Sequence, residues 1–205
     1  MSTNQGEVIK VSGPLVVARG LAGARMFEMV RVGEARLFGE IIEIRGDDYS
    51  IQVYEETEGI GPGQPVFPTG EALSVELGPG LIRSIYDGVQ RPLDKLYHDT
   101  GDFIVRGAES PPLDRAAIWG FVPVAKAGDT VGVGDVLGTV QESKLVVHKI
   151  MVPIGVAGTV SRIEPIKGNV ETAVAVIDTS NGPVSVNMIQ RWPVRHPRKV
   201  SRKLP

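Results

Sequence analysis

Short runs of apolar residues, many of them alternating with polar ones, fill the first 70 residues of the chain. Between them lie turn signals such as Gly13-Pro14, and Gly46 sits in GDD, a stretch suited to a hairpin because glycine tolerates a positive φ. The strand-like segments are GEVIKVSG, PLVVARG, MFEMVRVG, LFGEIIEIRG and YSIQVYEE. Five or six short strands in about 60 residues, with no helix between them, predict a small closed β-barrel over residues 1–70. The segment GIGPGQPVFPTG is interpreted as the punctuation that ends this barrel.

Residues 71–110 break this pattern and are predicted to be an extended connector. Helical turns are expected only around Ile85 and over Leu93–Tyr97, because GPGL and RPL interrupt any longer helix. Pro111-Pro112 then stiffens the chain and is predicted to mark a domain boundary.

Residues 111–188 return to short strands separated by turns and are predicted to form a second β-rich domain. Its turn signals are Gly128-Asp129, Gly134-Asp135 and Asn181-Gly182. With the first unit, this pattern predicts an all-β protein that has a closed N-terminal barrel, a second barrel-sandwich-like domain and little helix. The 25 glycines and 15 prolines among 205 residues, with abundant Val and Ile, agree with that class.

The composition excludes several kinds of chemistry. The chain has no cysteine, which rules out disulfides, zinc–thiolate sites and cysteine nucleophiles and favours an intracellular setting. The N-terminus lacks the basic and apolar regions of a signal peptide. The longest uncharged apolar stretch, IMVPIGVAGTV, has 11 residues and is too short to cross a bilayer, so no direct membrane insertion is expected.

The last residues, 189–205, are basic. The part from Arg191 onward holds six of the 22 Lys and Arg residues and none of the 24 Asp and Glu residues. Such a tail can bind nucleic acid, but prolines interrupt it and Trp192 is its only aromatic residue for base stacking. We therefore interpret it as a solvated linker and expect no nucleic-acid partner.

No catalytic constellation emerges from the motifs. The chain has no G-x-x-x-x-G-K-[ST] phosphate loop and no G-x-S-x-G elbow. His98, His148 and His196 stand apart from carboxylates at ligand spacing, and adjacent acids such as Glu55 and Glu56 point to opposite faces of a strand. We therefore predict no catalytic, cofactor-binding or metal-binding residue.

Lys144 raises one alternative. It follows two Gly-Asp turns and precedes Gly158-Thr159-Val160, which resembles the arrangement around the modified lysine of biotinyl and lipoyl carrier domains. However, its neighbours are Ser143 and Leu145, where biotin carriers have methionines, and Glu142 is one residue too far away for the lipoyl pattern. A carrier using Lys144 is kept as an alternative function, and so is a stand-alone assembly adaptor.

A more extensive resemblance covers the N-terminal half. VSGPLVVA, LFGEII, IQVYEETEGI, LSVELGPGLI and IYDGVQRPL occur in this order and resemble the start of the catalytic A subunits of archaeal-type and vacuolar-type rotary ATPases. The second β-rich unit resembles the inserted bulge domain of those subunits, and QRWPVRHPRKV resembles the segment leading to their nucleotide-binding domain.

This resemblance implies the non-catalytic N-terminal portion of an ATP-hydrolysing or ATP-synthesising subunit. In that family the barrels of A and B subunits join into the collar of a hexamer, and the bulge contacts the peripheral stalk of a proton- or sodium-translocating complex on the cytoplasmic side of the cell membrane. ATP, ADP and Mg²⁺ bind to later parts of the full-length subunit, so this chain is expected to bind none of them and to be inactive alone. Loop 55–70 is expected to face neighbouring subunits, and the stretch LIRSIYDG to expose apolar surface.

Overall fold

The computed structural model describes residues 5–197. The basic residues beyond Pro197 that were predicted to form a linker therefore lie outside the described part of the chain. The chain divides into two compact units. Unit 1 comprises Met1–Val75, Lys95–Glu109 and Pro193–Pro205, and unit 2 comprises Glu76–Asp94 and Ser110–Trp192.

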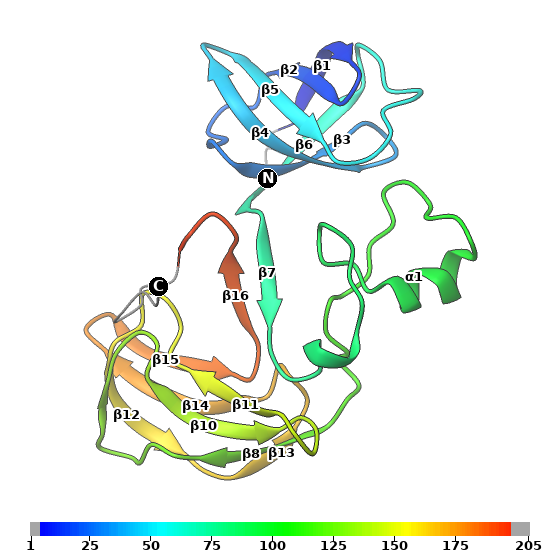
Figure 1. Ribbon diagram of the computed structural model, residues 1–205. Coiled ribbons are helices and arrows are strands. Elements are labelled where there is room, and N and C mark those ends of the chain that lie inside the picture. Colours follow the sequence, from blue (N-terminus) through cyan, green and yellow to red (C-terminus); the bar gives the residue numbers. More distant parts are fainter. Residues whose placement is uncertain (1–4, 198–205) are drawn as a thin grey trace, which may run out of the picture. The chain divides into compact units, whose positions relative to one another are not determined.

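Six antiparallel strands of unit 1 close into a barrel, drawn in blue to cyan-green in Figure 1. Around the barrel they follow the order β1-β2-β5-β4-β3-β6. They are β1 (Gly6–Ser12), β2 (Leu15–Arg19), β3 (Glu28–Val32), β4 (Leu37–Arg45), β5 (Asp48–Val53) and β6 (Pro65–Ala72). The predicted closed barrel is confirmed, and Gly46 takes the expected positive φ of 61° between β4 and β5.

One strand was missed by the sequence pattern. Strand β6 lies within the segment interpreted as punctuation, and it closes the barrel by pairing with both β1 and β3. A bulge interrupts its ladder with β3: Glu28 pairs with Ala72 but Val30 pairs with Pro68. The strand therefore tolerates a proline, which cannot donate to a regular ladder, beside an irregularity.

Alternating side chains of these strands fill the barrel. Its core consists of buried aliphatic residues from every strand, together with Tyr49 and Leu21. Gly39 is required in this interior, because a Cβ at its position would lie 2.7 Å from Cγ2 of Ile51. Along MFEMVRVG buried and exposed residues do not alternate, since Glu28, Met29 and Val30 are all buried.

Unit 2 contains two four-stranded sheets. One has the order β11-β10-β8-β13 and the other β15-β14-β12-β9. Their bounds are β8 (Trp119–Pro123), β9 (Thr130–Val131), β10 (Val136–Gln141), β11 (Val147–Met151), β12 (Gly158–Ile163), β13 (Ile166–Gly168), β14 (Ala173–Thr179) and β15 (Gly182–Asn187). Two apolar clusters lie in this unit, one around Leu137 and Ile177 and the other around Phe121 and Val140, and both sheets contribute residues to each cluster. The predicted all-β class is confirmed.

The segments outside the barrel and the two four-stranded sheets also contain regular structure. Strands β7 (Ser74–Leu77) and β16 (Gln190–Pro193) pair as a two-stranded sheet, so the predicted linker begins with a strand. A 3₁₀ turn, η1 (Leu81–Arg83), lies just before Ile85, and helix α1 (Leu93–Thr100) forms where helical turns were expected. In the described part of the chain, no helix has the length and apolar character needed to cross a membrane.

Candidate functional site

Glu40 lies on the outer face of the barrel and is nevertheless buried. Successive residues of a strand point to opposite faces, and the neighbours Leu37 and Ile41 belong to the barrel core. Glu40 therefore points away from that core, where a charged side chain normally meets water. Its side chain is only 1 % exposed, so other groups must cover it.

The covering group is Arg195, which is 155 positions away in the sequence. Its Nε donates to Oε1 of Glu40 at 2.8 Å, and its Nη2 donates to Oε2 at 2.6 Å. The Tyr54 hydroxyl donates a further hydrogen bond to Oε2, at 2.8 Å. A two-point guanidinium–carboxylate pair is among the stronger and more directional contacts in proteins.

Phe27 completes the surroundings of the guanidinium. The Cζ atom of Arg195 lies 4.3 Å from the centre of the Phe27 ring, a distance suited to a cation–π contact. Phe27 has a φ of 66°, in the left-handed region that a bulky residue rarely adopts. Its backbone N–H donates to the carbonyl of Ile41 at 2.8 Å, which helps to hold this conformation. We call Phe27, Glu40, Tyr54 and Arg195 the Arg195 site.

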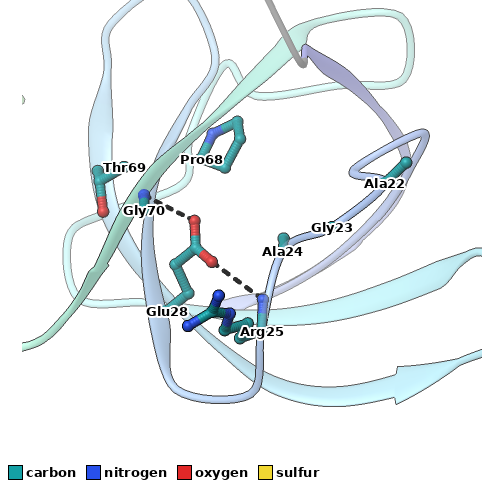
Figure 2. A pocket seen from close by; sticks show the side chains of 8 residues that line it. All are labelled: Ala22, Gly23, Ala24, Arg25, Glu28, Pro68, Thr69 and Gly70. Carbon is teal, nitrogen blue, oxygen red and sulfur yellow. Dashed lines mark hydrogen bonds between the residues drawn. The ribbon is translucent and has the colours of Figure 1, made fainter.

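The next residue, Glu28, points between Arg25 and Gly70 (Figure 2). Its buried carboxylate accepts hydrogen bonds from the backbone N–H of Arg25 at 2.9 Å and of Gly70 at 2.8 Å. Glu28 thereby links the loop before β3 to the bulge of β6, beside a pocket of about 410 Å³. Both carboxylate oxygens are engaged, so Glu28 acts as a structural support for Phe27.

The electrostatics of the site agree with a charged Glu40. The hydrogen bond from Arg195 is the main reason that the pKa of Glu40 lies below its usual range, although burial opposes it. Burial, then the hydrogen bond to Glu40, raises the pKa of Tyr54 to about 12. The same carboxylate raises the pKa of Arg195. At neutral pH the site therefore holds a carboxylate, a neutral phenol and a guanidinium. These groups bind one another, so the site holds two segments of the chain together.

Of the adjacent acids Glu55 and Glu56, only Glu55 makes hydrogen bonds that hold another segment of the chain. Glu56 is exposed to solvent. Glu55 is not, because its carboxylate accepts hydrogen bonds from the backbone N–H of Phe38 at 3.3 Å and of Gly107 at 2.7 Å. Part of the loop expected to face neighbouring subunits therefore contacts segment 106–109 of its own chain.

Two histidines lie near a carboxylate, contrary to the prediction: Nδ1 of His98 lies 3.2 Å from Oδ1 of the adjacent Asp99, and the second case is His148. His148 is half-buried, and its Nδ1 lies 3.6 Å from Oε2 of Glu142 across the β10–β11 hairpin. Burial lowers the pKa of His148, while Glu142 opposes that shift. Six positions separate the two residues in the sequence, and the pairing of β10 with β11 brings them together. Within residues 5–197, no group of three or more potential metal ligands is found.

Lys144 lies in the turn between β10 and β11, the position that a carrier lysine would need. Next to it, Leu145 is 95 % exposed. The expected apolar surface of LIRSIYDG is confirmed, since Ile82 and Ile85 are 66 % and 67 % exposed.

Sequence reasoning missed the Arg195 site. Glu40 reads as an ordinary polar position on the outer face of a strand, and Arg195 as one of several basic residues in a tail. The only local signal is WPVR itself, in which Arg195 closely follows an aromatic residue and a proline. No periodic pattern relates it to a strand near the N-terminus.

Comparison with known families identifies the class of this protein. The model of the ATP synthase alpha/beta family, beta-barrel domain, matches residues 8–70. The model of the ATPsynthase alpha/beta subunit barrel-sandwich domain matches residues 110–195. The chain belongs to the ATP synthase alpha/beta family, over these two domains.

Curated relatives specify the subunit type. The chain is 56 % identical over 200 residues to the V-type ATP synthase alpha chain of Clostridium perfringens strain SM101, covering 97 % of this chain and 34 % of the relative. It is 54 % identical over 203 residues to that of Acetivibrio thermocellus, covering 98 % and 34 %. For Clostridium botulinum strain Loch Maree the values are 53 % over 204 residues, covering 100 % and 34 %.

The chain thus spans about a third of the length of these relatives and matches their N-terminal region. The predicted resemblance to the catalytic A subunits is confirmed. The alternatives, a carrier using Lys144 and a stand-alone adaptor, find no support in these comparisons.

Proposed function

We propose that this chain is the non-catalytic front of the ATP-hydrolysing or ATP-synthesising subunit of a rotary ATP synthase. The observation that carries the proposal is the 53–56 % identity to V-type ATP synthase alpha chains over nearly the whole chain. The closed barrel and the two-sheet second unit, in the same order as the two matched domains, are consistent with it.

In this proposal the two domains have different partners. The barrel assembles with B subunits and with further A subunits into the collar of a hexamer, and the bulge contacts the peripheral stalk. The protein is then cytoplasmic and peripheral to the cell membrane as part of a proton- or sodium-translocating complex. ATP, ADP and Mg²⁺ bind to other parts of the full-length protein, and this chain alone neither binds nor hydrolyses ATP.

A chimera tests this function. Residues 1–205 would replace the matching N-terminal third of the Clostridium perfringens V-type ATP synthase alpha chain, expressed with the other subunits of that complex. We expect the chimera to assemble and to hydrolyse ATP, whereas the 205-residue chain alone shows no ATPase activity. A chimera that folds but neither joins the complex nor hydrolyses ATP would contradict the proposal. The unmodified alpha chain is the control.

A further inference from the structure

Arg195 lies in the short segment that follows β16, and it contacts Glu40 on the barrel. We propose that Arg195 is a positioning residue, which docks segment 193–196 on the barrel and thereby fixes the direction of the chain that follows it. The docking stands on contacts within unit 1. Its role for a following nucleotide-binding domain rests on the proposed function.

Glu40 would be buried without a charged partner if Arg195 left the barrel. The carboxylate is 1 % exposed although it points out of the barrel, and Arg195 supplies two of the hydrogen bonds that it accepts. A buried carboxylate without such partners is strongly unfavourable. The barrel therefore favours the state in which Arg195 is docked.

The backbone around Arg195 is fixed as well. The N–H of Val194 donates to the carbonyl of Leu73 at 2.9 Å, and the N–H of His196 donates to the carbonyl of Pro193 at 3.0 Å. The second contact closes a β-turn directly after β16, with Arg195 at its third position. The turn thereby places the guanidinium of Arg195 beside Glu40 and Phe27.

Phe27 has an unusual backbone conformation, with a φ of 66°. Its ring is not a core side chain, since the residue is 39 % exposed, and it lies against the Arg195 guanidinium. A left-handed backbone at a bulky residue is strained and persists only where the surrounding structure imposes it. Here the Glu28 carboxylate ties Arg25 of the loop to Gly70 of β6, which restrains the loop that carries Phe27.

The geometry specifies arginine rather than a positive charge alone. Only a guanidinium offers two parallel donors to both oxygens of Glu40 while its flat face contacts an aromatic ring. A lysine at position 195 would keep the positive charge but could not donate two parallel hydrogen bonds to Glu40. The variants R195M and R195K therefore separate docking from simple charge attraction.

Hydrogen exchange on the 205-residue chain tests the docking. In R195M we expect the amides of Val194 and His196 to exchange at least tenfold faster, while core amides such as that of Ile51 stay protected. R195K should show the same selective loss to a smaller degree. The matched control is R45M, because Arg45 is also on the barrel but is 81 % exposed. Unchanged protection of Val194 and His196 in R195M would overturn the proposal. If R195M does not fold, unchanged protection in R195K decides the same question.

The chimera tests the positioning role. We expect R195K to leave complex assembly and the KM for ATP unchanged and to lower kcat severalfold, while R45K leaves kcat unchanged. An R195K chimera with the kcat of the parent chimera would overturn the positioning role. An inactive parent chimera would instead count against the proposed function, and the exchange experiment would still test the docking separately.

Discussion

Glu40 combines three properties at a single residue: it is buried, it faces away from the barrel core, and it is charged. The charge is maintained because Arg195 and Tyr54 both donate hydrogen bonds to its carboxylate. Groups of this kind link folding to pH, since their proton affinity differs between the folded and unfolded chain.

The variant E40Q should alter how stability depends on pH. The pKa of Glu40 in the folded chain is lowered from an ordinary value of 4.5, so its contribution is present above that value and is lost as the pH falls through the folded pKa. At pH 7 we expect E40Q to lower the free energy of unfolding by about 1–3 kcal/mol. The difference from the parent should shrink below about pH 4.5. Urea unfolding at several pH values measures it, with the exposed Glu34→Gln as control.

Tyr54 provides a spectroscopic measure of the same contact. Its pKa of about 12 arises from burial and then from the hydrogen bond to Glu40. In E40Q the negative charge is absent, so the pKa of Tyr54 should fall toward its ordinary value of 10. Phenolate absorbance at 295 nm, assigned by comparison with Y54F, follows this titration. An unchanged Tyr54 titration in E40Q would show that Glu40 does not influence the phenol.

At the scale of elements, buried glutamates join segments that the strand ladders do not join. Glu28 links the loop before β3 to β6, and Glu76 receives Arg115 at 2.7 and 2.8 Å. Within unit 2, Glu142 accepts hydrogen bonds from the backbone N–H of Gly80 at 2.9 Å and of Ile82 at 3.0 Å. Each carboxylate satisfies donors that would otherwise lack partners, so these irregular segments are held in one conformation.

Segment 106–109 also lies close to another segment of the chain, and a glycine substitution can test this close approach. A Cβ at Gly107 would lie 2.0 Å from the carbonyl oxygen of Ala35, whereas a Cβ at Gly101 would meet nothing within 4 Å. Both glycines have a positive φ, of 70° and 76°. Gly101→Ala should therefore cost only the backbone strain, about 1 kcal/mol, and Gly107→Ala about 3 kcal/mol or more. Chemical denaturation measures both, and equal costs would contradict the close approach.

At the scale of the whole molecule, each unit has its own apolar core. The barrel core belongs to unit 1, and the clusters around Leu137 and Phe121 belong to unit 2. Separate cores are the physical basis for domains that unfold as separate cooperative units.

Calorimetry should therefore resolve two unfolding transitions, and a unit 2 variant should shift only one of them. Gly138→Ala would place a Cβ 2.3 Å from Cζ of Phe121 and should destabilise unit 2 by about 2–4 kcal/mol. Gly120→Ala, on the paired strand β8, meets nothing within 4 Å and should be neutral or slightly stabilising. A Gly138→Ala shift in both transitions would show that the units unfold together.

The sequence by itself determined the fold class and most of the hairpins. Turn residues act locally: a glycine such as Gly46 or Gly182 allows the positive φ that reverses the chain, and alternating residues on either side supply the strands. The family resemblance also rested on contiguous motifs that can be read without a structure. These features depend on neighbours in the sequence, so they leave a readable pattern.

Tertiary structure alone decided how the barrel closes and what Arg195 contacts. Strand β6 carries prolines and a glycine that read as turn signals, and only its two partner strands and a bulge make it a strand. Glu40 and Arg195 lie 155 positions apart, and neither has an unusual local context. Their contact depends on the folded surface that brings β4, the Phe27 loop and the turn after β16 together, and no local pattern of polar and apolar residues encodes such a convergence.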